Sequence, residues 1–393
     1  MLAAIFAADG RRVLLLERTR DGGRKILVSG GGRCNVLPSQ LAPGRFVTDS
    51  SPNTLRKMLL SWPLAEQQRF FEEEVGLELA LEPETGKLFP ASDSARQVRD
   101  GLVALARRRG VAFRFEALVE GLAPQPDGSW SIELQDGERI AAAAVIVATG
   151  GKSLPGTGSD GLGFELVRGL GHAVHPTYPA LTPLTAEPPR HAELAGISLD
   201  VTITAPGAGK GFTTRGGFLF THRGYSGPAV LDISHLAVRS LQAGGPRQTL
   251  LVQWTAQDAA SWNRALQEGS GVAAGVLRRE LPDRLAEVLL REAGVDPARP
   301  LHQLRREERL GAVELLTRYP LPWTGDEGYR KAEVTGGGVP LSEVDPRTLE
   351  SRIRPGLFLC GEILDAFGPI GGHNFAWAWA TGRAAGLGAR SRR

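Results

Sequence analysis

The segment LFLCGEILDAFGPIGGHNFAWAWATGRAAGL, residues 357–387, decides the fold class of this chain. Residues 357–360 form a continuous apolar run of the kind found in buried parallel strands. Residues 375–387 are rich in small residues and predict a packed helix. Because α/β proteins bind ligands at the carboxyl edge of such strands, the residues between strand and helix are expected at a ligand site.

The residues between this strand and this helix have the properties that a flavin site needs. Gly361 and Glu362 directly follow the strand, and the carboxylate of Asp365 is a candidate for ribityl or ribose hydroxyls. Gly371 and Gly372 allow the backbone to approach a flat ring, toward which the helix directs its first amides. In a flavoprotein this end faces the N1/C2=O edge, where negative charge collects on reduction. An ordinary glycine-rich turn before a packed helix is the alternative interpretation.

The start of the chain resembles the second half of a dinucleotide-binding βαβ unit. Residues 1–8 are rich in helix formers, Gly10 is a natural residue after a helix, and the apolar run 13–16 ends at Glu17. In such units the acid at the end of the second strand accepts hydrogen bonds from the adenosine ribose. The strand and the G-x-G-x-x-G turn that normally precede the helix do not occur in this sequence.

Two further glycine-rich segments are candidates for nucleotide contact. The first, GRKILVSGGGRCN at 23–35, has three successive glycines that can form a nest of backbone amides. Arg24, Lys25 and Arg33 add positive charge for a pyrophosphate. A mobile glycine loop is the alternative. The second segment, AVIVATGG at 144–151, is a buried-strand pattern whose final residues suit the close approach of a nucleotide.

The chain is long enough for two or three domains, because single cores stop growing at roughly 250–300 residues. Residues 1–160 and 330–393 are expected to form one discontinuous α/β domain. In it we expect helices over 55–74 and 94–109 and a hairpin at 82–89. Residues 161–329 are predicted to be an inserted domain, β-rich over about 172–254 and helical over about 255–319.

The composition excludes several classes of protein. Charged residues make up 23% and the mean hydropathy is −0.13, which is ordinary for a globular enzyme. No apolar run reaches the roughly 18 residues that span a bilayer, so no membrane partner is expected. The net charge of +3 comes from dispersed basic residues, apart from 107–109 and 390–393, so we expect no nucleic-acid partner. Only two cysteines occur, which fits a reducing cytoplasm.

Other catalytic chemistries have weak support. Cys34 has no resolving cysteine nearby, so we predict packing rather than a redox role. His222 and Ser226 lack the second glycine of a G-x-S-x-G elbow, so nucleophilic catalysis is not expected. No set of histidines and cysteines has zinc spacing, and we predict no metal.

Six segments make this chain resemble a known family. They are GRKILVSGGGRCNV (23–36), GKLFP (86–90), VIVATGG (145–151), LFTHRGYSGPAVLDIS (219–234), AEVTGGGV (332–339) and GLFLCGEILDAFGPIGGHNFAWAWATGRAAG (356–386). They resemble, in order and over nearly the whole chain, the bacterial FAD-dependent oxidoreductases of the BaiN type, also called aminoacetone-oxidase-like. The resemblance implies a Rossmann-like FAD-binding domain, without its N-terminal strand and glycine turn, that is interrupted by a β-barrel-like insert carrying a small helical segment.

Combining the resemblance with the motifs predicts the cofactor site, without assigning a catalytic residue. Its residues are Glu17, Arg18, Arg24, Lys25, Ser29, Gly30, Gly31, Gly32, Arg33, Cys34, Asn35, Val119, Thr149, Gly150, Gly151, Gly361, Glu362, Asp365, Gly371, Gly372, His373, Asn374 and Phe375.

This sequence departs from the family pattern at two places. The missing strand and diphosphate turn remove a helix N-terminus from the pyrophosphate and the central strand from the sheet, so we expect an unstable protein that binds FAD poorly. We therefore expect the natural start codon to lie upstream of Met1. His373 stands where the family commonly has Tyr. It is a candidate to donate a hydrogen bond or a proton beside the flavin, and a structural histidine is the alternative.

The main functional hypothesis is a cytoplasmic FAD-dependent oxidoreductase that transfers a hydride from NAD(P)H, through flavin N5, to a small organic substrate. One alternative is an oxidase that converts a small amine and produces hydrogen peroxide. Another is a flavin-free relic that acts as a binding or scaffold protein. An RNA-modifying flavoprotein is disfavoured by the dispersed charge. The substrate, the choice between NADH and NADPH and the oligomeric state stay open at this point.

Overall fold

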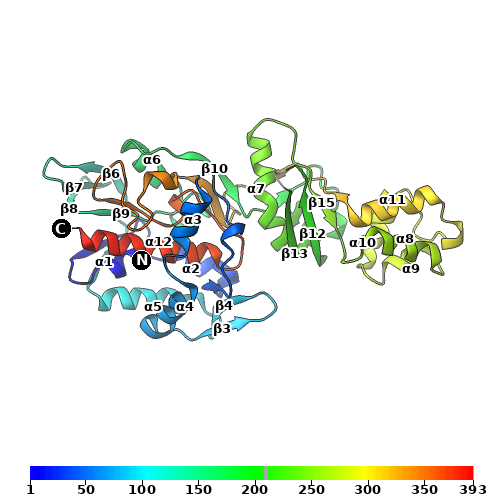
Figure 1. Ribbon diagram of the computed structural model, residues 1–393, viewed down its shortest axis with the longest axis horizontal. Coiled ribbons are helices and arrows are strands. Elements are labelled where there is room, and N and C mark those ends of the chain that lie inside the picture. The colour runs from blue at the N-terminus through cyan, green and yellow to red at the C-terminus, as the bar shows by residue number, and fades with distance from the viewer. Residues whose placement is uncertain (208–210, 393) are drawn as a thin grey trace. The chain divides into compact units, whose positions relative to one another are not determined.

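A computed structural model describes residues 1–207 and 211–392 of the chain. The chain divides into two compact units, one formed by 1–179 together with 333–393 and the other by 180–332 (Figure 1). The sequence placed the first boundary at 160. The structure assigns α6 (Leu162–Gly169) and most of β10 (His175–Ala180) to the first unit, because β10 pairs with β18 (Val334–Gly338).

The predicted buried strands form two separate parallel pairs in the first unit. β1 (Val13–Leu16) pairs with β5 (Val111–Arg114), and β9 (Val145–Val147) pairs with β19 (Leu357–Leu359). Within the described residues these pairs are not joined into one sheet. As a result β1 is only partly covered, and its Leu14 is 44% exposed.

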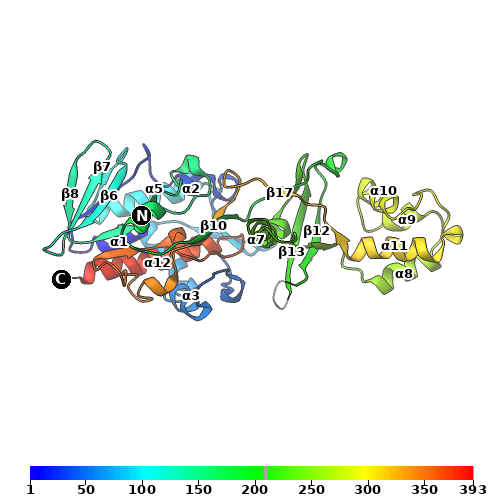
Figure 2. The same ribbon diagram turned by 90° about the horizontal axis from the view of Figure 1, so that it is seen from above.

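Helices at the two ends of the chain pack side by side. α1 (Leu2–Ala7) lies along α12 (His373–Ser391), as both views in Figures 1 and 2 show. Gly382 and Gly386 of α12 face α1, and a methyl group on Gly386 would lie 2.4 Å from the carbonyl oxygen of Ala3. The small residues that the sequence displays in this helix therefore allow close helix packing.

The helix predicted over 55–74 is in fact divided. It consists of α3 (Pro52–Leu59), α4 (Leu64–Arg69) and a π-helical turn, η3 (Phe70–Val75). Pro63 causes the break, since it lacks an amide hydrogen and disfavours helical geometry in the preceding residue. The predicted helix over 94–109 is α5 (Ala95–Arg108).

Small antiparallel sheets complete the first unit. β2 (Leu37–Pro38), β4 (Lys87–Pro90) and β3 (Leu79–Glu82) form one of them, which contains the predicted hairpin. β6 (Val119–Pro124), β7 (Trp130–Leu134) and β8 (Arg139–Ala142) form a meander. No described helix is long and apolar enough to cross a membrane.

The second unit contains a seven-stranded antiparallel sheet with the order β16-β15-β12-β13-β14-β11-β17. These strands are β11 (Leu184–Thr185), β12 (Ser198–Ala205), β13 (Phe212–Phe220), β14 (Gly224–Ser226), β15 (Leu251–Gln253), β16 (Tyr319–Pro320) and β17 (Gly325–Asp326). A helix that the sequence reading missed, α7 (Pro228–Gln242), packs on β13. Its residues lie inside the span we interpreted as β-rich, although Pro228 at the first helical position is a start signal.

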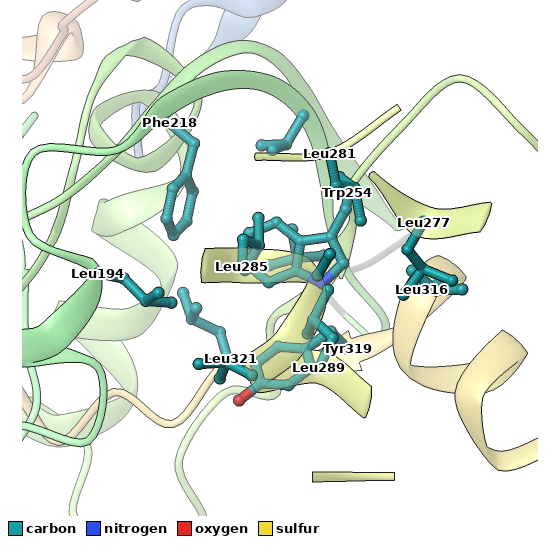
Figure 3. Close-up of a cluster of buried hydrophobic side chains, with 14 of the residues drawn as sticks. Leu194, Phe218, Trp254, Leu277, Leu281, Leu285, Leu289, Leu316, Tyr319 and Leu321 are labelled. Atoms are coloured by element: carbon teal, nitrogen blue, oxygen red, sulfur yellow. The ribbon is translucent and has the colours of Figure 1, made fainter. Parts of the chain in front are cut away.

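A helical segment with its own apolar faces joins this sheet. It contains α8 (Ala259–Glu268), α9 (Ala273–Leu277), α10 (Asp283–Glu292) and α11 (Arg306–Thr317). Leucines of these helices pack against aromatic residues of the sheet, as Figure 3 shows for Leu285, Leu289 and Trp254. One continuous core therefore spans the sheet and the helical segment of this unit.

Candidate functional site

The glycine turn before α12 is shaped by neighbouring backbone. Gly371 and Gly372 have φ values of +98° and +92°. A methyl group on Gly372 would lie 2.6 Å from the carbonyl carbon of Leu37, so this glycine is required for contact with β2. The Asn374 amide closes the preceding loop, since it accepts a hydrogen bond from Gly368 N at 2.8 Å and donates one to Gly368 O at 3.0 Å.

His373, the first residue of α12, is a buried and neutral histidine. It is 7% exposed, and among the described residues its Nδ1 atom has no hydrogen-bond partner. Burial, with a smaller contribution from the positive charge of Arg45, lowers the pKa of His373 to about 4. An unpaired buried nitrogen destabilises a folded protein, so a ligand or a water molecule is expected to form a hydrogen bond with it. Phe375, two residues further, stacks on Trp379.

Asp365 is bound by protein groups in this structure. Its carboxylate is buried, and Oδ2 accepts hydrogen bonds from the Asp49 amide at 3.0 Å and the Ser50 hydroxyl at 2.8 Å. Thr48 Oγ1 at 3.0 Å and His175 Nδ1 at 3.1 Å contact the same oxygen. Asp49, His175 and Asp365 have potential ligand atoms within 4.8 Å of one another, but these bonds favour a hydrogen-bonded cluster over a metal site.

The structure brings Lys25 and Glu362 together although they are 337 positions apart. Their side chains form an ion pair, and Ser153 Oγ lies 2.5 Å from the Lys25 ammonium and 2.7 Å from Glu362 Oε1. The amide of Thr335 also donates to Glu362 Oε1 at 2.9 Å. Gly151 is at the same place, since a methyl group on it would lie 2.4 Å from Thr335 Oγ1. Three predicted segments therefore meet here, with Ser153 and Thr335 as partners that sequence reasoning missed.

The glycines 30–32 have the left-handed backbone that only glycine adopts freely. Their φ values are 54°, 68° and 89°, they are exposed, and no atom lies within 4 Å of a methyl group built on Gly31. Ser29 turns its hydroxyl back to the Ile26 carbonyl at 2.7 Å. Asn35 lies beside the loop, with its backbone nitrogen 3.1 Å from a methyl group built on Gly30.

Arg33 differs from what the sequence suggested for a pyrophosphate site, whereas Cys34 is buried as expected. Arg33 is paired with Glu82 at 2.9 Å and Asp93 at 3.0 Å, and its guanidinium carbon lies 3.8 Å from the centre of the Phe89 ring. Its charge is thus largely balanced by protein carboxylates. Cys34 is fully buried, and burial raises the pKa of its thiol to about 11, which agrees with the packing role we expected.

A polar cavity lies where β1 ends. Thr19 donates to Glu17 Oε1 from both its amide and its hydroxyl at 2.8 Å, which fixes the carboxylate and leaves Oε2 without a bond from these two groups. The cavity of about 430 Å³ begins directly after Glu17. It is lined by Arg18, Thr19, Arg20, Arg24, Glu116, Pro155, Gly156 and Gly158. The sequence reading missed Arg20, Glu116 and the loop 155–158, whose glycines were the available signal.

Two of the three arginines that line this cavity form ion pairs with carboxylates. Arg18 pairs with Asp160, and Arg24 pairs with Asp21 at 2.6 Å. Of the other predicted residues, Thr149 packs against α6 and Gly150 has a φ of +74° beside Ser159. Val119 begins β6 and packs against the core of the first unit.

One constellation in this unit has the spacing of a hydrolase triad. His172 Nδ1 lies 2.6 Å from Glu343 Oε2, and His172 Nε2 lies 2.8 Å from Ser351 Oγ. Ser351 is only 6% exposed, and its hydroxyl also accepts hydrogen bonds from the amides of Ile353 and Arg354 at 3.0 and 2.8 Å. A nucleophile must be accessible to its substrate, so this group is a structural cross-link.

Taken together, the acid-terminated strand, the arginine-lined cavity and the glycine turn before a long helix define a dinucleotide-binding α/β protein. Residues 1–388 match the family described as HI0933-like protein Rossmann domain. The chain therefore belongs to the HI0933-like family of FAD-dependent Rossmann-fold proteins.

Relatives match over nearly their whole lengths. An Escherichia coli protein named ribosomal RNA dihydrouridine synthase is 35% identical over 389 residues, covering 96% of this chain and 92% of that protein. A Clostridium scindens protein named 3-dehydro-bile acid delta(4,6)-reductase is 32% identical over 401 residues, covering 100% of this chain and 97% of that protein. A Haemophilus influenzae ribosomal RNA dihydrouridine synthase is 32% identical over 399 residues, covering 98% and 94%.

Proposed function

We propose that this chain binds FAD and reduces a carbon–carbon double bond that is conjugated with a carbonyl group, with NAD(P)H as the electron donor. The observation that carries the cofactor part is the meeting of Lys25, Gly151 and Glu362, three predicted cofactor residues from distant segments, at one place in the first unit. Residues that a sequence separates widely converge in this way at ligand sites.

The residues present fit FAD. Among the described residues His373 offers a buried, unpaired nitrogen, and Gly31 and Gly361 have left-handed backbones with open space where a side chain would lie. Glu17 would hold the ribose hydroxyls, and the arginine-lined cavity beside it would hold phosphate groups. The amides at the start of α12 would favour negative charge on the bound ring. When bound, the flavin supplies hydride transfer between the donor and the substrate.

The substrate class is proposed from the relatives. The uracil base of uridine has a C5=C6 bond conjugated with its C4 carbonyl, and reduction of this bond converts uridine to dihydrouridine. A steroid with a 3-oxo group and a double bond at C4 has the same conjugated unit, which is the unit that the name of the C. scindens relative describes. Both names thus describe one chemical step on different molecules.

We propose uridine in ribosomal RNA as the substrate. Two relatives are named ribosomal RNA dihydrouridine synthase, and one of them is 35% identical to this chain. The dispersed charge led us to expect no nucleic-acid partner, and a free conjugated ketone is therefore the second candidate. The C. scindens relative supports this second candidate.

The test begins with the purified chain under anaerobic conditions. Flavin absorption in the purified protein, bleached by NADH or NADPH, is the expected result, and a colourless protein that takes up no FAD would refute the cofactor part. Reduced protein is then mixed with ribosomal RNA lacking dihydrouridine or with a conjugated ketone. Mass spectrometry of the nucleosides detects uridine that has gained two hydrogen atoms. Bleaching by a small amine, with hydrogen peroxide formed in air, would support the oxidase alternative instead.

A further inference from the structure

Strand β4 of the GKLFP motif lies against both glycine turns of the predicted flavin site. Lys87 and Phe89 are two positions apart in β4 and therefore point to the same face of the strand. A methyl group on Gly371 would lie 3.3 Å from Cε of Lys87, and one on Gly30 would lie 3.2 Å from Cε1 of Phe89. The GKLFP motif contributes no residue to the predicted cofactor site. It places Lys87 beside the turn that precedes α12.

The position of Lys87 is fixed by backbone pairing on both sides. Its partners across the sheet are Pro38 of β2 and Glu82 of β3. β2 is in turn held against α12, because the Trp379 indole donates to the carbonyl of Val36 at 3.0 Å. The close contact of Gly372 with β2 connects the same two elements at the other end. The backbone of Lys87 therefore cannot move away from the start of α12 without breaking this ladder.

The ammonium of Lys87 is available for a ligand. Its cross-strand neighbour Glu82 is already bound by Arg33 at 2.9 Å and by the Thr85 hydroxyl at 2.5 Å. Asp93 is also bound by Arg33, at 3.0 Å. The positive charge of Lys87 is one of the smaller causes that lower the pKa of Glu82, but no carboxylate of the described residues forms an ion pair with Lys87 at contact distance, and its side chain is partly exposed. A lysine that the fold positions but does not pair is a candidate for holding a negatively charged oxygen.

A second observation at the same turn also points to a ligand. The side chain of His373 is more than nine-tenths buried, with 7% of the residue exposed, and its Nδ1 atom is without a partner in the described part of the chain. The start of the 19-residue helix α12 contributes a positive end at the same place. Lys87 and the start of α12 thus lie beside the same glycine turn, and His373, the residue after that turn, carries the unpaired nitrogen and has its ring edge-on to Phe46.

We propose that Lys87 is a catalytic residue of the reduction, and that its ammonium binds the carbonyl oxygen of the substrate. This proposal rests on the proposed function. A bound reduced flavin would supply a hydride to the carbon β to the carbonyl, the π electrons of the double bond would move onto the oxygen, and the substrate would become an enolate. Lys87 stabilises that oxygen anion until a proton from solvent is added at the α carbon. NAD(P)H then restores the reduced cofactor, so electrons and protons balance.

The test compares Lys87→Met with Lys87→Arg in the full chain, and Lys57→Met serves as the matched control because Lys57 is an exposed lysine of α3. We expect both Lys87 variants and the control to keep the FAD content and the rate of bleaching by NAD(P)H of the wild type. Reoxidation by a conjugated ketone or by RNA should slow about 100-fold or more in Lys87→Met, which is the loss typical of one oxyanion donor. Lys87→Arg should recover part of the rate because it keeps the charge.

A binding measurement makes the test independent of turnover. A phenolate resembles the enolate in charge and shape, and we expect its equilibrium affinity for the oxidised protein to fall about tenfold in Lys87→Met, with no change in Lys57→Met. Unchanged phenolate affinity and unchanged reoxidation in Lys87→Met would overturn the proposal, as would loss of FAD from that variant, since Lys87 would then be a cofactor ligand. If the wild type reduces no conjugated carbonyl, the proposed function fails, and the phenolate measurement still decides whether Lys87 binds an oxygen anion.

Discussion

The contact between α1 and α12 can be tested with two glycine-to-alanine substitutions in α12. One is expected to lower the stability of the protein and the other to raise it. Gly386→Ala would place a methyl group 2.4 Å from the carbonyl oxygen of Ala3 and 2.9 Å from Cβ of Phe6. The Ala3 carbonyl belongs to the backbone of α1, so it can make room for this methyl group only if α1 moves. Overpacking of this kind costs about 1–3 kcal/mol, whereas replacing a helical glycine by alanine gains about 0.5–1 kcal/mol. We expect a net loss of about 1–2 kcal/mol for Gly386→Ala.

Gly382→Ala is the matched control on the same helix. Its methyl group would lie 3.4 Å from Cβ of Leu2 and 3.6 Å from the amide nitrogen of Ala3, which are ordinary contacts. Only the higher helix propensity of alanine then affects this variant, so its free energy of unfolding should rise by about 0.5 kcal/mol. Both variants add one methyl group to α12. Opposite changes in stability would therefore result from the different distances between that methyl group and α1.

Because the chain has two compact units, a single unfolding free energy need not describe it. Hydrogen exchange of peptides from α1 and α12, followed by mass spectrometry, measures the local stability directly. Faster exchange in Gly386→Ala and slower exchange in Gly382→Ala are expected. Equal or slower exchange in Gly386→Ala would refute the inference that α1 packs this closely on α12.

Three further predictions concern buried groups. Cys34 and Cys360 should stay unlabelled by a thiol reagent at pH 8 until the protein is unfolded, because burial raises the pKa of each thiol to about 11, and rapid labelling of the folded protein would contradict this. Burial lowers the pKa of His235 from 6.5 to about 4 in the folded protein. As the pH drops, His235 is therefore protonated in the unfolded chain before it is protonated in the folded protein. The free energy of unfolding should fall by about 3 kcal/mol between pH 6.5 and pH 4. His235→Phe should flatten that part of the stability profile, and an unchanged slope would argue against the shift. Asp365→Ala should cost about 1–3 kcal/mol in urea unfolding of the FAD-free protein, since it leaves partly buried donors such as the Ser50 hydroxyl without their acceptor, and an unchanged midpoint would show that these bonds contribute little.

The sequence by itself determined the local features of this protein. Apolar runs predicted β1, β9 and β19, and the runs of small and helix-forming residues predicted α1 and α12. The acid Glu17 and the glycines before α12 predicted a nucleotide site, and the family match supports FAD as its class of ligand. These features depend on residues within a few positions of one another, which is the range over which periodicity and capping signals act.

Only the tertiary structure decided which distant residues meet. Lys25 and Glu362 are 337 positions apart, and no local pattern indicates that they form an ion pair. The same holds for Lys87, whose place beside Gly371 follows from the pairing of β4 with β2 and the packing of β2 on α12. Arg33, which the sequence suggested as a pyrophosphate ligand, is paired with Glu82 of the neighbouring hairpin and with Asp93 just after it. Partner choice among charged and polar groups follows from packing across the whole unit, and local sequence patterns do not record it.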